Sequence, residues 1–399
     1  MSRGIDIAIA GSGVVGATAA CLLADAGFEV AVIDPATLPE IEDDAYDLRV
    51  FSLTPATLAV LKRAGIWHEV NHRRVAGYRR MEIWDAGSRG HIAFDGADIG
   101  LDRLGVIVEF ANLAQGALSA LRARRVAVRA CRLEALEELP ERCRLTLSTG
   151  EQIEAAIVLG CDGRQSRVRE LAGIGWRERD EVQHAVVANL DLALPHGSVA
   201  RQRFLAEGPL AFLPLPAPQQ VSIVWSTTPA QAAWAVEAAD DAFCAAIGEA
   251  FEYRLGAVVK TSPRLAFPLR RLHANDYATR RVALAGDAAH TILPLAGQGL
   301  NLGLLDVAAF AEVLRAAGRP ALAAPRSALR RYARRRRGEN AAMDLACEAL
   351  NHLFCATRRP VRCARGCGLA VTNRLPLAKR LFMAYATGTA GDVPELAQI

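Results

Sequence analysis

Lysine is scarce in this sequence, and long apolar runs are missing from it. Of the 47 basic residues only Lys62, Lys260 and Lys379 are lysines, a bias that we attribute to codon composition rather than to phosphate binding. The formal net charge of +4 is too small to indicate a nucleic-acid partner. No apolar stretch approaches the roughly 20 residues of a membrane-spanning helix, and the start MSRGIDIAIA lacks the features of a signal peptide. We therefore expect a cytoplasmic protein.

The nine cysteines follow no metal-binding pattern. Cys355, Cys363 and Cys367 lie near His352, but their spacing matches no zinc motif. Free thiols are the ordinary state in the cytoplasm, so we predict no metal site. The chain of 399 residues is long enough for two domains, and its 52% hydrophobic content is sufficient for a sizeable core.

A glycine-rich turn stands between a strand and a helix near the start of the chain. The run GSGVVG at positions 11–16 fits the pattern G-x-G-x-x-G. It follows the apolar run Ile5–Ala10 and leads into a helix predicted over Val14–Ala26, with Gly27 as its cap. A second strand, Val30–Ile33, ends at an acidic residue. This context indicates a dinucleotide-binding turn rather than a structural loop.

Each position of the turn has a physical role. Gly11 allows the tight turn, Gly13 lets the backbone approach a pyrophosphate, and Gly16 permits close packing of helix and strand. The phosphates would bind the first amides of the helix, including that of Val15, where the helix dipole favours negative charge. Asp34 would accept hydrogen bonds from the adenosine ribose, which favours FAD or NAD over NADP at this site.

A second motif follows the apolar strand Val282–Ala285. Asp287 at the end of this strand can accept hydrogen bonds from a polyol. Gly297 and Gly299 form another tight turn, and we expect a helix to start at about Asn301. Its first amides would face the pyrimidine edge of a flavin, where the reduced ring carries negative charge. The predicted cofactor contacts here are Asp287, Pro294, Gly297, Gln298, Gly299, Leu300 and Asn301.

A third motif, Cys161-Asp162-Gly163, follows the strand Ala155–Gly160, with Ser166 and Arg169 behind it. In their order along the chain, the three motifs resemble those of the p-hydroxybenzoate-hydroxylase-like FAD monooxygenases. The resemblance implies bound FAD, with Asp287 on the ribityl chain and Asp162 near FAD and the path of the nicotinamide nucleotide.

Within this group the sequence looks closest to the ubiquinone-biosynthesis hydroxylases of the UbiH/UbiF/VisC type. The stretches YDLRV at 46–50 and DIG…LGVIVE at 98–109 carry this resemblance. It implies that Arg49 lies near the flavin and that Asn112 belongs to a helix in contact with FAD. Phe110 and Leu293 depart from the family pattern, where Asn and His are frequent, and leave the substrate and the hydroxylated ring position open.

The middle of the chain has a different residue pattern, in which short predicted strands alternate with proline-rich segments. We expect strands at His184–Leu194, Leu210–Leu215 and Val221–Thr227 and a hairpin formed by Met81–Trp84 and His91–Phe94. The predicted fold is α/β with an α+β second domain. A Rossmann-like FAD-binding domain would comprise residues 1–75, 105–180 and 270–335, an inserted mixed β-sheet substrate domain residues 76–104 and 181–269, and a helical C-terminal region residues 336–399.

The resemblance implies an enzyme in which NADH or NADPH reduces the FAD and O2 supplies the oxygen that hydroxylates an aromatic ring. The implied substrate is a polyprenyl phenol or benzoquinol of ubiquinone biosynthesis. The chain has no second G-x-G-x-x-G after a strand, so the reductant would bind transiently. The alternatives are a hydroxylase of a soluble phenol, a flavin reductase of the same fold, and a non-catalytic flavin-binding subunit of a quinone-biosynthesis complex.

No catalytic base is assigned; Arg49, His290 and Pro294 are weak candidates. A histidine just after Gly-Asp-Ala-Ala is more often a structural residue beside the cofactor than a proton carrier. An apolar substrate cavity lined by Phe212, Leu213 and Trp225 is one interpretation, and ordinary sheet core is the other.

Two C-terminal segments could each contact a membrane or another protein, and the sequence does not decide between these partners. The arginine-rich run at 329–337 is interpreted first as a solvated helix face, with contact to an anionic membrane or to a partner protein as alternatives. The segment Leu375–Ala386 is apolar enough for a homo-oligomer contact or an interfacial helix. Peripheral contact with the inner face of a membrane therefore stays open beside the cytoplasmic location.

Overall fold

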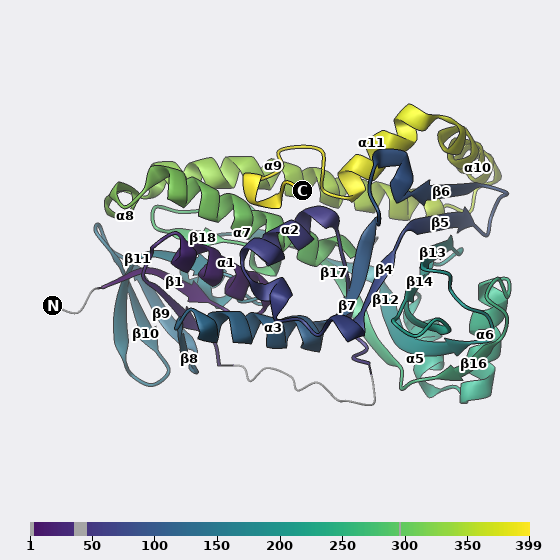
Figure 1. The fold of residues 1–399 in the computed structure, drawn as a ribbon, viewed down its shortest axis with the longest axis horizontal. Helices are drawn as coiled ribbons and strands as arrows, with labels where there is room; N and C mark the ends of the chain where they lie inside the picture. The colour runs from purple at the N-terminus through teal and green to yellow at the C-terminus, as the bar shows by residue number, and fades with distance from the viewer. Residues whose placement is uncertain (1–3, 36–45, 295–296) are drawn as a thin grey trace.

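The computed structural model describes residues 4–35, 46–294 and 297–399. Its first sheet has the strand order β8-β2-β1-β11-β10-β9, with β18 paired to β11 (Figure 1). The strands β1, β2, β8, β11 and β18 are parallel, whereas β9 and β10 form an antiparallel meander at one edge. Their bounds are β1 Ile5–Ala10, β2 Val30–Ile33, β8 Ala127–Arg129, β9 Leu133–Glu138, β10 Cys143–Leu147, β11 Gln152–Gly160 and β18 Val282–Leu284.

Helices cover this sheet because their apolar residues pack on it. The helices α1 and α7 pack against each other, α3 packs on α1, and α9 packs on α7 and β18. One continuous apolar core joins the sheet to these helices. In Figure 1, α9 runs along the upper edge of the molecule and α3 along the lower edge. The bounds are α1 Val14–Asp25, α2 Pro55–Arg63, α3 Phe110–Ala123, α4 Arg167–Leu171, α7 Gln298–Ala317, α8 Pro320–Ala323 and α9 Arg326–Cys355.

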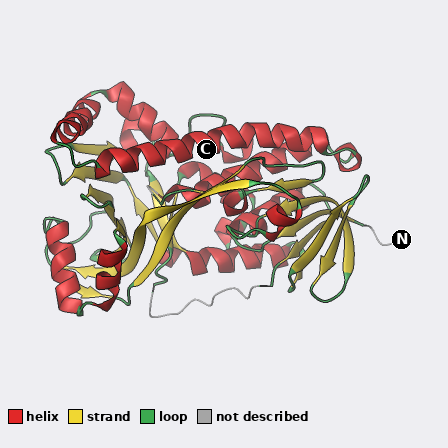
Figure 2. Ribbon diagram, turned by 180° about the vertical axis from the view of Figure 1, so that it is seen from behind, coloured by secondary structure: helices red, strands yellow, loops and turns green. Residues whose placement is uncertain are grey.

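A second, larger sheet lies beside the first and has the order β19-β17-β12-β15-β14-β13-β5-β6, with β16 paired to β12. The helices α5 and α6 pack on one face of it and enclose an aromatic core. Its long strands β12 and β17 run across the middle of the molecule (Figure 2). The bounds are β5 Arg80–Asp85, β6 His91–Asp95, β12 Trp176–Leu192, β13 Val199–Phe204, β14 Pro209–Pro214, β15 Gln220–Thr227, β16 Val258–Thr261, β17 Leu265–Ala274, β19 His290–Thr291, α5 Pro229–Glu237 and α6 Asp240–Ala250.

A small antiparallel sheet with the order β3-β7-β4 joins the two larger ones. The C-terminal helices α10 and α11 lie at the upper right in Figure 1, beside the hairpin of β5 and β6. None of the helices in the described ranges is both long and apolar enough to cross a membrane. The bounds are β3 Val50–Leu53, β4 Val75–Tyr78, β7 Gly105–Glu109, α10 Arg359–Arg374 and α11 Pro376–Ala386.

The predicted fold class is confirmed, with differences at the ends of elements. The first helix ends at Asp25 rather than Ala26, and α7 begins at Gln298, one turn before the expected start at Asn301. The strand β12 begins as early as Trp176 because it pairs with β17 from Trp176 to Val187. The domain division stays a proposal, since β12 and β17 both cross its boundaries.

Candidate functional site

The turn between β1 and α1 folds as the glycine pattern predicts. Gly11 has a φ of +100°, and a side chain there would collide with the carbonyl oxygen of Cys161. A side chain at Gly16 would collide with the carbonyl oxygen of Gly11. At Gly13, by contrast, an added Cβ would meet no atom of the described residues within 4 Å. The first and third glycines are therefore required by the fold, whereas the middle glycine borders open space.

The amino-terminal end of α1 is available to an anion. Gly13 caps this helix without a side-chain hydrogen bond from the described chain, and no acidic residue stands in its first turn. Beside it, one carboxylate oxygen of Asp34 accepts hydrogen bonds from the Ser12 amide at 2.5 Å and the Ser12 hydroxyl at 2.8 Å. Asp34 therefore fixes the turn and stands at its edge, where the predicted ribose contact would lie.

The loop after β18 presents a carboxylate from a buried backbone. Gly286 adopts a φ of +60°, and Gly286, Ala288 and Ala289 are buried, yet the side chain of Asp287 is exposed. Protein nevertheless surrounds this carboxylate densely enough that desolvation raises its pKa, while the charges of His290 and Arg164 lower it less. The carboxylate is thus partly desolvated and still accessible to a ligand.

His290 points into the protein and pairs with a buried carboxylate. Its Nε2 lies 2.6 Å from Oδ2 of Asp306, and both side chains are fully buried. The same Oδ2 accepts a hydrogen bond from the backbone amide of Gly286 at 3.1 Å. The other oxygen, Oδ1, accepts hydrogen bonds from Arg336 Nε and Asn340 Nδ2, each at 2.9 Å. Asp306 therefore connects the loop that carries Asp287 to α9, and the geometry favours the structural interpretation of His290.

The charge of Asp306 is held by this network. Burial alone would raise the pKa of Asp306, but the charge and hydrogen bond of His290, with Arg336 and Asn340, lower it to about 2. The carboxylate is consequently ionised at neutral pH although no solvent reaches it. A buried charge is tolerated only when it is paired and hydrogen-bonded in this way.

The amino-terminal end of α7 repeats the arrangement of α1. Its cap is Gly297, with a φ of +63°, and no side chain of the described residues caps the helix. An added Cβ at Gly299 would meet nothing within 4 Å in the described chain. The side chain of Asn301 is buried and holds the neighbouring chain: its Nδ2 donates to the Ser52 and Gly297 carbonyls, and its Oδ1 accepts from Thr54 and Thr57. Asn301 thus positions the turn, and its predicted contact with a cofactor stays a prediction.

The third motif is held by its own hydrogen bonds and contacts the loop of the second motif. Asp162 accepts from the Ser166 hydroxyl at 2.5 Å and the Val168 amide at 3.0 Å, so both carboxylate oxygens have partners in the chain. Arg169 is buried and donates to the carbonyl oxygens of Ala288 at 2.8 Å and Arg164 at 2.7 Å. The motif therefore supports the Asp287 loop from behind, and its direct contact with a cofactor stays a prediction.

These parts fit a flavin dinucleotide. Two helix amino-terminal ends, at α1 and α7, offer amides to a pyrophosphate and to an electron-rich ring edge. Open space at Gly13 and Gly299 admits the ligand to the backbone, and the exposed carboxylate of Asp287 stands after the strand β18. FAD has a matching order of groups: a pyrophosphate for the amides of α1, a polyol chain for the carboxylate of Asp287, and a ring system for the amides of α7.

A family model described as an FAD binding domain matches residues 4–345. The chain belongs to this family. Across nearly its whole length it is also similar to curated hydroxylases. It is 37% identical to the 3-demethoxyubiquinol 3-hydroxylase of Escherichia coli K12, covering 96% of this chain and 98% of the relative. It is 35% identical to the ubiquinone hydroxylase UbiL of Rhodospirillum rubrum, covering 98% and 91%. The predicted family is thereby confirmed, and the chain is an FAD-dependent oxidoreductase.

The fold is likewise that of FAD-dependent monooxygenases. The structure of p-nitrophenol 4-monooxygenase PnpA from Pseudomonas putida superposes with a TM-score of 0.77 at 19% identity, covering 96% of this chain and 98% of that one. PqsL from Pseudomonas aeruginosa superposes with a TM-score of 0.74 at 24% identity, covering 93% and 100%. At such identities the likeness concerns the fold alone.

Other residues predicted to contact FAD lie around the site in different ways. Asn112 is buried, and its amide exchanges two hydrogen bonds with the backbone of Asn71, so it supports a neighbouring turn. Arg49 is exposed, and its guanidinium lies 4.2 Å from the ring centre of Phe110. Phe110 is the residue that departs from the family pattern, and it gives Arg49 a cation–π partner. Pro294 is partly buried at the end of the described chain before Gly297.

Two of the three predicted substrate residues lie in ordinary core. Phe212 stacks on Phe251 with ring centres 3.6 Å apart, and Trp225 belongs to the same aromatic core under α5 and α6. Leu213 points to the opposite face of the sheet, because successive residues of a strand alternate between faces. The joint cavity lined by all three is therefore wrong, and Leu213 alone remains a candidate.

The opposite face carries an apolar cluster that sequence reasoning missed. Leu213 packs there with Tyr78, Leu215 and Met383, the last from α11. The hydroxyls of Tyr78 and Ser52 lie 2.9 Å apart, and Asn301 Nδ2 donates to the carbonyl oxygens of both Ser52 and Gly297. We name this set, Tyr78, Leu213, Leu215 and Met383, the apolar wall. Its members come from three distant segments of the chain, and only the alternation along β14 indicates its existence from the sequence.

The arginine-rich run lies on α9 and has two faces. Arg336 is buried against Asp306, and Arg335 pairs with Glu312 at 2.8 Å and Asp392 at 2.7 Å. For these two residues the interpretation as a solvated face is wrong, because they tie α9 to α7 and the C-terminus. Arg330, Arg334 and other arginines of the helix are exposed.

In the described ranges, no group of three His, Cys, Asp or Glu side chains is placed to hold a metal.

Proposed function

We propose that this oxidoreductase hydroxylates the aromatic ring of a prenylated benzoquinol, using NADH or NADPH and O2. One observation carries the proposal: the exposed carboxylate of Asp287 follows a buried glycine, Gly286, that packs against Val15 of α1 and Gly303 of α7. The 3-demethoxyubiquinol 3-hydroxylase and UbiL, to which the chain is similar, are named for such substrates.

The proposed cofactor contacts follow from the donors and acceptors of the site. The amides at the start of α1 would hold the pyrophosphate, and Asp34 the adenosine ribose. Asp287 would hold the ribityl chain, and the amides at the start of α7 the pyrimidine edge, where the helix dipole stabilises negative charge. Bound FAD supplies the redox chemistry, taking electrons from the nicotinamide and activating O2.

The apolar wall supports a substrate with a hydrocarbon tail. Tyr78, Leu215 and Met383 are buried, and Leu213 is partly buried beside them. Ser52 connects this wall to the turn at Gly297, so a ring held against α7 would have the wall at its side. A dry wall would also exclude water from the reacting oxygen.

The test is hydroxylation by the purified, FAD-loaded protein in air. O2 uptake, NADH or NADPH oxidation and product mass are measured with a short-chain prenylated benzoquinol and with the same ring lacking the tail. We expect a hydroxylated product and a lower KM for the prenylated ring. The variant Leu213→Trp should raise the KM for the prenylated ring, whereas Leu194→Trp, at a site 51% exposed, should not.

Each other result points to a different assignment. Equal turnover of the ring without a tail would indicate a hydroxylase of soluble phenols. Oxidation of the nicotinamide without any hydroxylated product would indicate a flavin reductase. Bound FAD that is not reduced by either nicotinamide would indicate a non-catalytic subunit, and failure to bind FAD would contradict the site itself.

A peripheral membrane contact through α11 also belongs to this proposal. One face of α11 buries Met383 in the apolar wall, while Leu377, Leu381 and Tyr385 on the other face are 81%, 60% and 49% exposed. An apolar helix face beside the wall suits an enzyme whose substrate resides in a bilayer. Co-sedimentation with lipid vesicles tests this, and a double change Leu377→Ser and Leu381→Ser should abolish it. A concentration-dependent dimer that the same change dissolves would instead assign this face to a second copy.

A further inference from the structure

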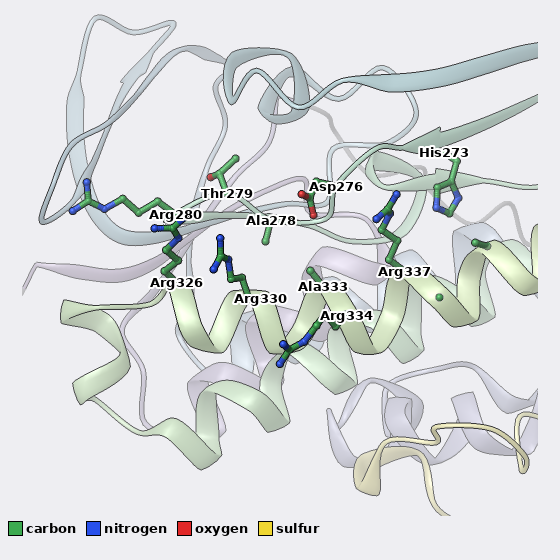
Figure 3. A pocket seen from close by; sticks show the side chains of 12 residues that line it. His273, Asp276, Ala278, Thr279, Arg280, Arg326, Arg330, Ala333, Arg334 and Arg337 are labelled. Atoms are coloured by element: carbon green, nitrogen blue, oxygen red, sulfur yellow. The ribbon is translucent and has the colours of Figure 1, made fainter.

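A groove that none of the predicted cofactor contacts lines runs between α9 and the segment that joins β17 to β18. Its volume is about 960 Å³. Figure 3 shows arginine side chains along it, from α9 on one side and from Arg280 on the other, with His273 at one end. We call this the arginine groove; the side chains that matter are Arg280, Arg326, Arg330, Arg334, Arg337 and His273.

The sequence places four of these arginines on one face of α9. Arg326, Arg330 and Arg334 follow each other at intervals of four residues, and Arg337 follows three residues later. At 3.6 residues per turn these positions form a single stripe, about 16 Å long at a rise of 1.5 Å per residue. Like charges at this spacing repel each other and destabilise the helix. The stripe therefore needs an explanation other than the stability of α9.

Among the residues that the structure describes, the arginines of the groove find no acidic partner. Within residues 4–35, 46–294 and 297–399, none of the five forms an ion pair or a side-chain hydrogen bond. Their neighbours on the same helix do: Arg335 pairs with Glu312, and Arg336 with Asp306. The carboxylate of Asp276 also lines the groove and accepts the amide of Tyr277 at 3.1 Å. One carboxylate leaves most of the positive charge uncompensated.

His273 adds an independent observation at the end of the stripe. Both of its ring nitrogens are shielded from solvent and have no hydrogen-bond partner in the described chain. Burial is the largest influence on the pKa of His273 and lowers it; the charges of His290 and Arg337 lower it further, and those of Asp344 and Asp306 oppose them without reversing the shift. At neutral pH the ring is therefore uncharged and keeps one N–H to donate. An unsatisfied buried donor beside a row of free guanidinium groups indicates a missing acceptor.

The shape and lining of the groove select the kind of acceptor. Its floor consists of small residues, Ala278, Ala333, Gly338 and Ala341, which leave room for an extended ligand. No aromatic side chain other than the His273 ring is present to stack on a nucleobase, and the exposed apolar side chains that would enter a bilayer lie on α11 instead. The guanidinium fork binds phosphate oxygens in pairs.

We propose that the arginine groove binds a soluble compound with several phosphate groups in a row. The spacing of the arginines matches a chain of phosphates along α9, and His273 donates to the phosphate at the inner end. This site does not depend on the hydroxylation reaction, because none of its residues is among the predicted FAD contacts. It does share α9 with Arg336, which holds Asp306 and through it the loop that carries Asp287.

The probe is inorganic tripolyphosphate, titrated into the FAD-loaded full chain by calorimetry at low salt. The double variant Arg330→Gln and Arg334→Gln removes the middle of the stripe. The matched control, Arg331→Gln and Arg359→Gln, removes the same charge from exposed arginines outside the groove. We expect saturable binding by the natural chain, a dissociation constant roughly 10-fold higher for the groove variant, and less than about 2-fold higher for the control. His273→Ala should weaken binding without changing the net charge at neutral pH.

Several results would overturn the proposal. They are an absence of saturable binding, equal weakening in both double variants, or tighter binding of hexaglutamate than of tripolyphosphate, which would assign the groove to an acidic protein segment. Binding to phosphatidylglycerol vesicles that tripolyphosphate fails to displace would assign it to a membrane. The FAD absorbance and the Tm of each variant establish that it is folded. Weak binding of tripolyphosphate by a folded groove variant then results from the loss of its arginines and not from misfolding.

Discussion

Arg169 donates from Nη1 to the carbonyl oxygen of Ala288 at a distance of 2.8 Å, across 119 positions of the chain. Its Nη2 donates to the carbonyl oxygen of Arg164, within the turn that follows β11. One buried guanidinium thus joins the loops that follow two neighbouring parallel strands, β11 and β18. The position of Asp287 depends on this link, because Asp287 precedes Ala288 directly.

Replacement of Arg169 tests the link. Lysine carries the same charge but cannot reach two carbonyl oxygens with one planar fork. We expect Arg169→Lys to lower the free energy of unfolding by about 2–3 kcal/mol, because a buried acceptor loses a charged donor. Arg167→Lys, on the exposed side of the same short helix, is the control and should change it by less than about 1 kcal/mol. Urea denaturation of both variants measures the difference; equal values would show that the fork has no special role.

Removal of the charge at Asp287 should weaken FAD binding. A hydrogen bond to a charged acceptor contributes about 1.5–3 kcal/mol, so Asp287→Asn should raise the Kd for FAD by roughly 10-fold to 100-fold. The control is Asp102→Asn, which removes an equal charge from an exposed loop. The absorbance of the apoprotein reconstituted with FAD gives both constants. An unchanged Kd in Asp287→Asn would remove this residue from the site.

Gly13→Ala should separate folding from cofactor binding. Because an added Cβ at Gly13 meets no atom of the described chain within 4 Å, the apoprotein should fold with a Tm within a few degrees of the natural one. The methyl group would occupy the space of the pyrophosphate, and we expect a Kd for FAD at least about 10-fold higher. Gly368→Ala, on the exposed face of α10, also adds a methyl group in open space and should leave FAD binding unchanged. Tight FAD binding by Gly13→Ala would contradict the predicted approach of the phosphates.

The buried pair of Asp306 and His290 predicts how stability depends on pH. The pKa of Asp306 is about 2 in the folded protein against an ordinary 3.8, so ionisation of this group contributes roughly 2 kcal/mol to folding. Because the folded pKa is the lower one, this contribution is present above about pH 4 and is lost as the pH falls toward 2.

Denaturation of Asp306→Asn measures this effect. At neutral pH the variant leaves the buried Arg336 without its counter-charge, and we expect a loss of about 3–5 kcal/mol. The difference from the natural chain should shrink as the pH falls from about 4 toward 2. Asp25→Asn, which breaks a pair whose carboxylate is 47% exposed, should cost less than about 1 kcal/mol. A loss in Asp306→Asn that stays constant with pH would show that the ionisation is not what stabilises the network.

Features that depend on neighbouring residues could be predicted from the sequence. The strand from Ile5 to Ala10, the turn at Gly11 and the helix from Val14 follow from local periodicity and from glycine chemistry, and the structure has them at those residues. The β-rich part was predicted by the same means. The extent of β12 was not, because its first residues are polar and are held in the strand by pairing with β17.

Features that depend on distant residues were missed. Asp306 lies in an apolar helix, and nothing in its neighbours shows that Arg336 and His290 meet it. The apolar wall likewise takes Tyr78 and Met383 from opposite ends of the chain. Position along a strand decides which face a residue occupies, and this alternation separates Phe212 from Leu213, so the interpretation as one shared cavity fails and that of sheet core holds for Phe212.

The continuity of β12 and β17 limits how the molecule moves. These strands remain hydrogen-bonded from Trp176 and Ala274, beside the first sheet, to Val187 and Leu265, deep in the second, with one irregularity between Asp180 and His184. A rotation of one half of the molecule against the other would have to twist or break this shared ribbon. Exchange of substrate and product is therefore expected through local displacement of loops or of α11, on the faster timescales of small segments, rather than through hinge opening of two rigid bodies.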